Sequence, residues 1–511
     1  MSNFQSAVPT PLRFDAELVR LDQRSQGVLV CGKGGSGKSV HVAQSMLNDY
    51  IRGVPVVAMD GTGGATDYFL YYVNQLPTGE RATALERIHY VDLGSPEYVT
   101  PLPALYRLHA DEPLYDVANR WLRILKTYVP DLIENPVMGW NAVYDLGLTC
   151  FMTLAALNCQ ITEATDFLHN PQKWAARLQQ LPLDKNPELT ALISSVEYFA
   201  AQEGAWVRKK VESLLNQLKV FSLDPTMSAT FCSDKPGIDW PKVMKLRQVV
   251  LVDFRNIANS DHRDFLAVGV LDSLMSFIKH RGPGRHTPLA LYVDDMSMLC
   301  RRHPKQQQWF AEELSSLIHI YSRSSNIWPT LITQELSFVP PSVLPLLMAF
   351  GAQVIGCNPD LESSEILAKS LIGFDPDPAK PVQVYTSDPV KGRPSVVDQT
   401  TADPSLHLKL ELWKLQIRSL SKFKFLVRSC GEGGLDRELR RVSLAGVAKD
   451  GWPQREVIGE LRNDLLKKHG TPIEHIRKEI EERQAALTWL KQPLSPTKLS
   501  TAVFSQDTVW V

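Results

Sequence analysis

Two kinds of hydrophobic pattern divide the chain. In the first hundred residues, short continuous apolar runs flank a segment whose apolar residues recur at helical spacing, and this segment ends at Gly53. Continuous apolar runs beside glycine-rich turns predict strands buried on both faces, and strands that alternate with helices predict a parallel sheet covered by helices. The predicted strands are residues 27–31, 54–60 and 87–94, and the predicted helix covers residues 38–52.

Helical periodicity extends from about residue 105 to about residue 230, and strand patterns return after it. We therefore expect an all-α subdomain inserted into the sheet domain. Residues 372–405 are rich in proline and aspartate and are expected to form loops, whereas residues 454–488 form a charged helical pattern. The later predicted strands are residues 249–254, 289–295, 329–334, 352–357 and 423–428.

Composition narrows the class of protein. A chain of 511 residues is expected to form two or three domains, and 44% hydrophobic with 22% charged residues is typical of a soluble globular protein. Seven cysteines without a CxxC pair argue against a structural zinc site or a disulfide framework and favour the cytoplasm. The sequence predicts no signal peptide and no transmembrane segment. The net charge of −1 does not indicate nucleic acid, although a basic lumen can exist inside a neutral molecule.

A glycine-rich motif, GKGGSGKS, spans Gly32 to Ser39. Its glycines allow successive backbone N–H groups to point at phosphate oxygens, while Lys38 supplies a charge for the β- and γ-phosphates and the Ser39 hydroxyl can bind Mg²⁺. An accidental glycine-rich turn is disfavoured because a predicted strand precedes the motif and a predicted helix follows it. We therefore expect ATP and Mg²⁺ as cofactors, with the nucleotide held by Gly32, Lys33, Gly34, Gly35, Ser36, Gly37, Lys38, Ser39 and Val40.

A phosphate-bound Mg²⁺ also needs a carboxylate at the end of a second buried strand. Asp253 ends one candidate strand, and Asp294 and Asp295 end another. The pair is favoured because Asp294 could orient the metal, together with Ser39, while Asp295 polarises an attacking water. Asp253 then remains as a structural residue at a strand end.

Two further residues are candidates for hydrolysis. Gln334 ends the predicted strand 329–334, and its amide could contact a γ-phosphate and a water at once. Arg323 precedes that strand and could act as an arginine finger toward a neighbouring subunit, or it could be an ordinary surface arginine. The basic segments 279–286 and 300–305 could contact nucleic-acid phosphates, but solvated surface is the favoured interpretation.

The order of these segments resembles the conjugative coupling ATPases of type IV secretion, VirD4/TraG/TraD-like, within the HerA/FtsK superfamily of P-loop DNA motors. The P-loop is the most specific segment, and the order of the others supports it. The resemblance implies an α/β, RecA-like P-loop NTPase fold with a central, mainly parallel sheet and an inserted all-α subdomain. The segments that carry it are GKGGSGKS (32–39), VVAMDGTGGATD (56–67), YVDLGSPEYVTPLPAL (90–105), LALYVDDMSML (289–299), SRSSNIWPTLITQELS (322–337), FGAQVIGCNPDLESSEILAKSL (350–371) and KKHGTPIEHIRKEIEERQ (467–484).

The corresponding domain boundaries follow from the pattern and the motifs together. Residues 1–104 would form the first part of the ATPase domain, residues 105–235 the inserted domain, residues 236–430 the second part of the ATPase domain, and residues 431–511 a helical C-terminal tail.

The function implied by the resemblance is an ATP-driven DNA translocase that acts as a ring, expected to be a hexamer. Single- or double-stranded DNA, a relaxase or relaxosome and secretion-channel proteins would be its partners, and a partner could recruit it to the inner face of the membrane. Asp295 stands where the family commonly has glutamate, and the family's N-terminal transmembrane helices are not found in this sequence. The alternative is an ATP-binding scaffold or regulatory subunit of a mobile-element or antiphage complex without motor activity. A metabolic P-loop kinase is disfavoured by the long helical insertion.

Overall fold

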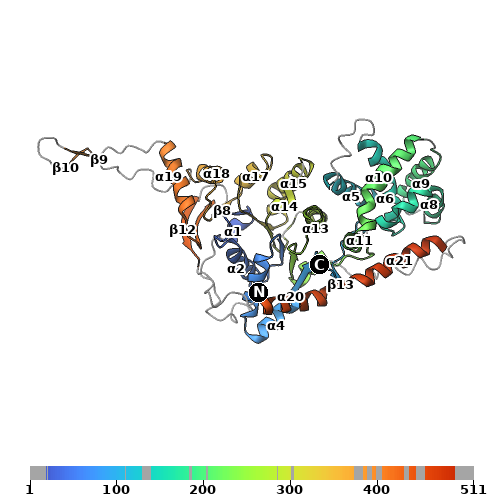
Figure 1. The fold of residues 1–511 in the computed structure, drawn as a ribbon, viewed down its shortest axis with the longest axis horizontal. Helices are drawn as coiled ribbons and strands as arrows, with labels where there is room; N and C mark the ends of the chain where they lie inside the picture. Colours follow the sequence, from blue (N-terminus) through green and yellow to red (C-terminus); the bar gives the residue numbers. More distant parts are fainter. Residues whose placement is uncertain are drawn as a thin grey trace. The chain divides into compact units, whose positions relative to one another are not determined.

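The chain divides into two compact units, which are described separately (Figure 1). The sheet unit comprises residues 1–102, 122–139 and 237–470, and the helical unit comprises residues 103–121, 140–236 and 471–511. The computed structural model describes residues 19, 21–109, 111–128, 140–182, 187–202, 205–282, 284, 286–300, 304–372, 384–387, 394–398, 406–430, 437–444 and 455–489.

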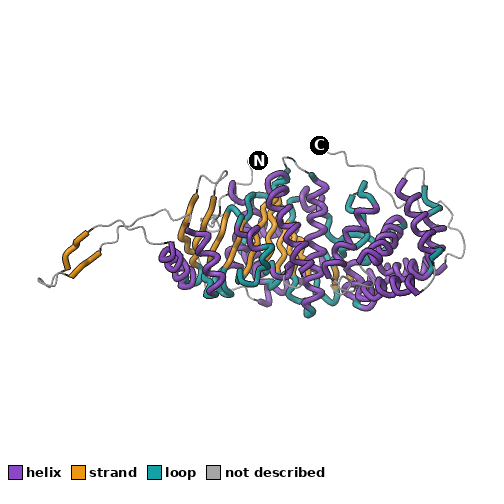
Figure 2. The backbone as a smooth tube through the Cα atoms, turned by 90° about the horizontal axis from the view of Figure 1, so that it is seen from above, coloured by secondary structure: helices purple, strands orange, loops and turns teal. Residues whose placement is uncertain are grey.

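A nine-stranded sheet forms the centre of the sheet unit, in the order β12-β11-β8-β1-β7-β6-β2-β5-β3. Figure 2 shows its strands side by side with helices packed against them. The strands from β8 to β3 pair in parallel, and β11 and β12 extend the β8 edge in antiparallel pairing. The strands are β1 (Val28–Cys31), β2 (Val56–Asp60), β3 (Ile88–Asp92), β5 (Val249–Asp253), β6 (Leu289–Asp294), β7 (Ile327–Thr333), β8 (Ala352–Ile355), β11 (Lys424–Cys430) and β12 (Arg437–Ser443).

The predicted α/β fold with a mainly parallel sheet is confirmed. Every residue of β1, β2, β3, β5, β6 and β8 is buried, which is why these strands read as continuous apolar runs. The charged sequence RELRRVS of β12 has no such run, and the sequence did not predict it because it is an edge strand. Four short strands were also missed: β4 (Tyr98–Val99), β13 (Thr471–Pro472), β9 (Val384–Ser387) and β10 (Pro394–Asp398).

The prediction of loops for residues 372–405 is wrong in part. β9 and β10 pair antiparallel within this segment, because backbone pairing between two nearby strands needs no strong apolar pattern. The rest of the segment up to residue 405, beyond Ile372, lies outside the described residues.

Helices connect the strands of the sheet unit. The α2 helix follows β1 after the glycine-rich segment and buries Val42, Ala43, Met46 and Leu47 in the main hydrophobic core. The expected helical region after residue 430 contributes α20, which contacts β3, as well as later helix. The helices are α1 (Leu21–Arg24), α2 (Lys38–Ile51), α3 (Gly64–Asn74), α4 (Thr78–Arg87), α12 (Trp240–Leu246), α13 (Ser260–Arg281), α14 (Ser297–Cys300), α15 (Pro304–Ser316), a π-helical turn η5 (Leu317–Tyr321), α16 (Ser322–Ser324), α17 (Leu344–Met348), α18 (Leu361–Leu371), α19 (Leu406–Ser419) and α20 (Arg455–His469).

The helical unit has its own aromatic core. Trp121, Phe221 and Phe231 pack edge to face, with ring centroids 4.9 to 6.4 Å apart. The last helix belongs to this core, because Arg483 forms an ion pair with the fully buried carboxylate of Glu163. The helices are α5 (Leu114–Tyr128, which begins here and ends in the sheet unit), α6 (Trp140–Ala156), η3 (Ile161–Glu163), α7 (Ala164–His169), α8 (Pro171–Leu178), α9 (Pro187–Ala200), α10 (Ala205–Leu223), α11 (Pro225–Phe231) and α21 (Ile473–Trp489).

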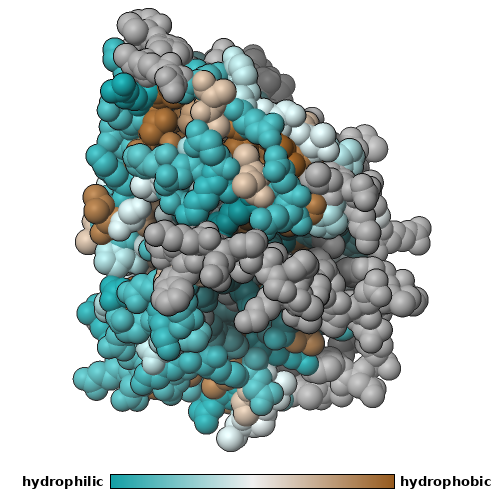
Figure 3. All heavy atoms as spheres, turned by 90° about the vertical axis from the view of Figure 1, so that its right-hand side faces the viewer, coloured by the Kyte–Doolittle hydropathy of each residue, from teal (hydrophilic) through white to brown (hydrophobic). Residues whose placement is uncertain are grey.

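In the view of Figure 3 most of the described surface is hydrophilic, and hydrophobic side chains form only small areas. Among the described helices, none combines the length and the apolar character needed to cross a bilayer.

A candidate nucleotide-binding site at the carboxyl edge of the sheet

The predicted P-loop follows β1, between the carboxyl ends of β7 and β8. Its first residues are tied to both neighbours: Gly32 N donates to Thr333 O (3.4 Å), and Lys33 N donates to Cys357 O (2.7 Å). The loop then turns at Gly35 and Gly37, whose φ values of 76° and 105° are conformations that glycine adopts readily. The α2 helix begins at Lys38, so its N-terminal N–H groups point toward the concavity of the loop.

Lys38 lies inside this loop. Its ammonium donates to the carbonyl oxygens of Gly32 and Lys33, the latter at 3.0 Å. Burial lowers the pKa of Lys38, and the nearby carboxylates of Asp294 and Asp295 oppose that shift. A cation held by backbone carbonyls and attracted to two carboxylates is placed to neutralise phosphate oxygens at the loop.

Asp294 ends β6, two strands from β1, and is 8% exposed. Its Oδ2 atom is buried and has no hydrogen-bond partner. Burial raises the pKa of Asp294 to about 7; the nearby carboxylates of Asp60 and Asp295 act in the same direction, whereas Lys38 opposes them. An ionised carboxylate in such a position is costly unless a cation pairs with it.

The donors here fit Mg²⁺ bound with a nucleotide. Mg²⁺ prefers hard oxygen ligands and is usually held by one or two carboxylates together with phosphates and water. The unpartnered Asp294 oxygen is such a ligand, and the half-buried Ser39 hydroxyl at the start of α2 is another. In the described part of the chain, no three His, Cys, Asp or Glu side chains are arranged to hold a metal by themselves. Phosphate oxygens and water are the further ligands that Mg²⁺ commonly takes in nucleotide sites.

Asp295 directly follows the strand and adopts a left-handed backbone conformation with φ of 61°. Its carboxylate accepts a hydrogen bond from the Ser297 hydroxyl. The neighbouring turn approaches it closely, since a Cβ atom on Gly61 would lie 3.0 Å from the Asp295 Cβ. Non-glycine residues in this conformation are uncommon, and strain of this kind is concentrated at functional sites.

The two remaining predicted residues lie near opposite ends of β7, one after its carboxyl end and one before its amino end. Gln334 directly follows β7, and a Cβ atom on Gly34 would lie 3.7 Å from its Oε1 atom, so its amide reaches the P-loop. Arg323 lies in α16, before the amino end of β7, and its side chain is exposed. The structure therefore brings Lys38, Asp294, Asp295 and Gln334 together and leaves Arg323 at the other edge.

A glycine-rich turn follows β2, the neighbour of β6, and borders the site. The Asp60 carboxylate accepts hydrogen bonds from the backbone N–H groups of Thr62, Gly63 and Thr66 at 2.7 to 3.1 Å, and thereby satisfies an N–H group in the first turn of α3. The turn also lies against the P-loop, because a Cβ atom on Gly64 would lie 3.3 Å from Ser39 Oγ. The position of this turn thus affects the space beside Ser39.

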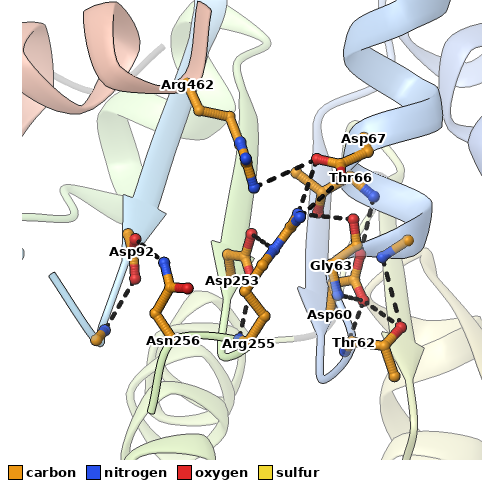
Figure 4. A network of polar contacts seen from close by, with 12 residues as sticks. Asp60, Thr62, Gly63, Thr66, Asp67, Asp92, Asp253, Arg255, Asn256 and Arg462 are labelled. Atoms are coloured by element: carbon orange, nitrogen blue, oxygen red, sulfur yellow. Dashed lines mark hydrogen bonds and ion pairs between the residues drawn. The ribbon is translucent and has the colours of Figure 1, made fainter. Parts of the chain in front are cut away.

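Arg255 ties the same turn to β5 (Figure 4). Its guanidinium donates to Asp253 (Nε, 2.7 Å), to both carboxylate oxygens of Asp67 (2.7 and 2.9 Å) and to the carbonyl of Gly63 (2.7 Å). We refer to Arg255, Asp253, Asp67 and Gly63 as the Arg255 network. Arg462 of α20 adds a longer contact of 3.5 Å to Asp67.

Asp253, the alternative metal ligand, belongs to this network. It lies on β5, two strands further from the P-loop than Asp294, and its buried carboxylate also accepts from the Tyr90 hydroxyl (3.0 Å). Burial raises the pKa of Asp253 to about 6, although Arg255 opposes the shift. Arg255 and Tyr90 already donate hydrogen bonds to the Asp253 carboxylate. Asp253 therefore has a structural role at this strand end.

The four aspartates at these strand ends form a row. The pairing places Asp294 beside Asp60, Asp60 beside Asp253, and Asp253 beside Asp92. Asp92 accepts from Gly94 N (2.9 Å) and from the Asn256 amide (2.6 Å). Three of the four carboxylates are therefore satisfied by the protein, and Asp294, next to the P-loop, keeps an unpartnered oxygen.

Sequence reasoning missed one residue that lies on the P-loop. Phe423, in the turn before β11, donates its N–H to Ser36 O (2.9 Å), and a Cβ atom on Gly37 would lie 2.5 Å from its ring. Only the antiparallel pairing of β11 with β8 brings it there, so no local signal announces it. Arg255 was also missed. The sequence gives one signal for it, which is its position directly after the predicted strand that contains Asp253.

In the basic segment 279–286, two described basic side chains contact other parts of the protein. Lys279 forms an ion pair with Glu313 (2.8 Å), and Arg281 donates to the carbonyls of Thr287 and Ser325 (2.9 and 3.0 Å). Residues 283, 285 and 301–303 of these segments lie outside the described residues.

The chain is similar in fold to several solved structures. It matches the bacterial conjugative coupling protein TrwBdeltaN70 in an unbound form at 15% identity, over 83% of this chain and 85% of that chain, with a TM-score of 0.48. It matches VirB4 of Thermoanaerobacter pseudethanolicus at 13% identity, over 83% and 91% of the two chains, with a TM-score of 0.49. The plasmid coupling protein TrwB in complex with ADP and Mg²⁺ matches at 15% identity, over 83% and 86%, with a TM-score of 0.47. No protein-family model and no curated protein matches the chain. The likeness concerns the fold alone.

Proposed function

We propose that this chain is an ATPase whose hydrolysis drives the translocation of DNA. The observation that carries the nucleotide site is the unpartnered, buried Asp294 oxygen beside a complete P-loop, with Lys38 attracted to the same carboxylate. A buried carboxylate without a partner is stabilised when a divalent cation joins it, and a P-loop supplies the phosphates that complete such a site. The DNA-translocase part is supported by the motif order described in the sequence analysis.

Each residue has a distinct task in this proposal. Lys38 would bind the β- and γ-phosphates, and Ser39 and Asp294 would hold Mg²⁺, which would neutralise phosphate charge. Asp295 orients and polarises the attacking water, and the Gln334 amide contacts the γ-phosphate side of the site. The convergence of the strand and loop ends that carry these residues at one edge of the sheet supports these roles.

A ring is part of the proposal because of Arg323. The residue lies at the amino edge of its own sheet, away from its own P-loop, so it can stabilise a transition state only in a neighbouring subunit. We propose a homo-oligomeric ring, a hexamer, with nucleotide between subunits and DNA in the lumen. Its partners would be a relaxase, a relaxosome or a secretion-channel protein, in the cytoplasm or at the inner face of the membrane.

The test is the ATPase rate with and without DNA. We expect DNA to stimulate the wild-type rate several-fold, and Lys38→Ala to abolish turnover because the phosphates lose their cation. Lys369→Ala is the matched control, since Lys369 is an exposed helix residue that pairs with Glu365 in an (i, i+4) contact. An Arg323→Ala subunit should lower the rate when mixed with wild-type subunits, which reports action across an interface.

A scaffold that uses ATP only to assemble is the second candidate. It is favoured by one observation, the aspartate at position 295, which places its carboxylate one methylene further from a water than a glutamate would. Under this alternative, ATP analogues would change the oligomeric state, measured by light scattering, whereas DNA would leave the turnover rate unchanged. Absence of ATP binding by the wild type would overturn both candidates.

A further inference from the structure

The turn before β11 is fixed onto the P-loop by backbone hydrogen bonds. Phe423 N donates to Ser36 O (2.9 Å), and Phe423 O accepts from Leu444 N (2.9 Å) at the end of β12. Phe423 is thus held on one side by the P-loop and on the other by the edge of the sheet. Its position relative to the P-loop is set by main-chain contacts and not by a flexible side chain.

Phe423 has a backbone conformation that its side chain disfavours. Its φ is 63°, in the left-handed region that bulky residues rarely adopt. The ring lies directly against Gly37, itself at φ of 105°, where an added Cβ would come within 2.5 Å of it. A glycine or asparagine would satisfy this turn with less strain. The turn conformation alone therefore does not explain the phenyl ring, part of which packs against the hydrophobic core.

One face of the ring is covered by a cation. Phe423 is half-buried, and the ammonium of the exposed Lys422 lies over the ring, 4.9 Å from its centroid. A cation on a solvent-exposed stem can exchange its place for another group, because exposed cation–π contacts are weak. A flat group can therefore reach the face that Lys422 covers.

The sheet order gives the direction of a bound nucleotide. Asp294 and Gln334, the groups suited to the γ-phosphate and its metal, follow β6 and β7, on one side of β1. Phe423 lies on the other side of β1, where β8 and β11 pair. A triphosphate with its γ end at Asp294 and its chain along the P-loop directs its nucleoside toward Phe423.

We propose that Phe423 forms the base subsite of the nucleotide site, with the base stacked on its ring. This inference rests on the proposed nucleotide site. Stacking uses the π-face that every base presents and reads none of its hydrogen-bonding edge, so the larger purines are favoured over pyrimidines and ATP is not distinguished strongly from GTP. The ligand class is thus a purine nucleoside triphosphate. Lys422 leaves the ring as the base arrives.

The test compares nucleotides with inorganic tripolyphosphate, which has no base. Dissociation constants for ATP, GTP, CTP and tripolyphosphate are measured by calorimetry with the full chain and Mg²⁺, for the wild type and two variants. Phe423→Asn removes the ring but tolerates the left-handed turn, and Phe423→Tyr keeps a ring. We expect Phe423→Asn to weaken ATP and GTP about ten-fold and tripolyphosphate less than two-fold, with Phe423→Tyr close to the wild type.

The ratio of ATP to tripolyphosphate affinity separates the possible outcomes. Equal loss of both ligands in Phe423→Asn would mean that the ring only supports the P-loop, and an unchanged ATP affinity would mean that no base contacts it; either result overturns the base subsite. Wild-type protein that binds tripolyphosphate as tightly as ATP also overturns it while leaving the P-loop site intact. Failure of the wild type to bind either ligand contradicts the proposed function itself.

Discussion

Asp60 and Asp294 occupy paired positions at the carboxyl ends of neighbouring parallel strands, but only Asp60 is satisfied by the protein. The Asp60 carboxylate accepts three backbone hydrogen bonds from the turn that begins α3, whereas the Asp294 Oδ2 atom is buried without a partner. Their proximity also raises the pKa of Asp294, because two carboxylates so close cannot both ionise without cost. The first carboxylate organises the site, and the second is left available to a cation.

The stability of the protein without ligand should fall as the pH rises through the range in which Asp294 ionises. Its pKa is about 7 in the folded protein, against an ordinary value of 3.8, so the folded state binds the extra proton between these values. The stabilisation is complete below about pH 4 and is lost as the pH approaches 7, by at most about 4 kcal/mol. Asp253, with a pKa raised to about 6, contributes with the same sign over a narrower range.

Urea unfolding between pH 5 and 8 measures this effect. Asp294→Asn should flatten the pH dependence and be more stable than the wild type at pH 8, since it removes the buried charge without removing the hydrogen-bonding shape. The matched control is Asp464→Asn, an exposed aspartate on α20, which should keep the wild-type profile. A wild-type stability that rises steadily from pH 5 to 8 would contradict the assignment.

The sequence predicts the parts of this site in which a chemically distinctive residue stands at the end of a recognisable strand. The apolar runs reveal the strands, and the P-loop and the Asp294–Asp295 pair stand at their ends, so the residues that would bind phosphate and metal are visible without coordinates. Which strands are neighbours is not visible. The row that joins Asp294, Asp60 and Asp253 depends on pairing between strands far apart in the chain.

Two contacts illustrate why the rest of the site could not be predicted from the sequence. Arg255 and Asp67 are separated by 188 positions, and either could have been an ordinary surface residue. Phe423 reaches the P-loop because an antiparallel strand returns along the β8 edge of a parallel sheet, and the sequence FKFLVR gives the strand but neither its direction nor its neighbour. Register and strand order are tertiary properties, and no alternation of apolar residues encodes them uniquely.

Removing the guanidinium of Arg255 should destabilise the sheet unit strongly. Asp253 is fully buried and receives two hydrogen bonds from Arg255, through the backbone N–H (3.0 Å) and Nε (2.7 Å). Arg255→Ala leaves this carboxylate without its cation and should lower the free energy of unfolding by about 3–5 kcal/mol. Arg255→Lys should recover less than half of the loss, because an ammonium cannot reproduce the fork that holds Asp67, Asp253 and the Gly63 carbonyl together.

Urea unfolding at constant pH gives these free energies. Lys369→Ala removes an exposed pair in the same unit and should change the free energy by no more than about 0.5 kcal/mol. Equal stabilities of Arg255→Lys and the wild type would show that charge alone, without the fork geometry, holds the turn. The pKa of Asp253 should rise further in Arg255→Ala, since the group that opposes its protonation is gone.

Gly63 and Arg255 should be energetically coupled. Gly63 has φ of 76°, and a Cβ atom there would lie 1.9 Å from Arg255 Nε, which three acceptors hold in place. Gly63→Ala should therefore cost about 1–2 kcal/mol of backbone strain and, in addition, disrupt the Arg255 network. In the Arg255→Ala background only the strain remains, so the double mutant should be more stable than the sum of the single changes by about 1–3 kcal/mol.

A double-mutant cycle in urea tests this coupling. Gly79→Ala is the control, because Gly79 lies in α4 with no atom within 4 Å of an added Cβ, and the change should be neutral or slightly stabilising. Strict additivity of Gly63→Ala and Arg255→Ala would show that the guanidinium moves aside freely. It would also remove the support for the Arg255 network as the element that positions the Gly61–Gly64 turn beside Ser39.

Asp294 and Asp295 should be separable by kinetics, because one would bind the metal and the other would act on water. Asp295→Asn should lower kcat by about 10²–10³-fold with little change in the affinity for ATP, since it removes only the group that polarises the attacking water. Asp294→Asn should weaken Mg²⁺-dependent ATP binding and raise the Mg²⁺ concentration needed for turnover. Asp464→Asn serves as the control for both.

Steady-state rates across a Mg²⁺ titration, with binding measured separately, distinguish the two effects. If Asp295→Asn instead loses ATP affinity in proportion to kcat, its left-handed turn beside Gly61 shapes the site and the proposed role in activating water is wrong.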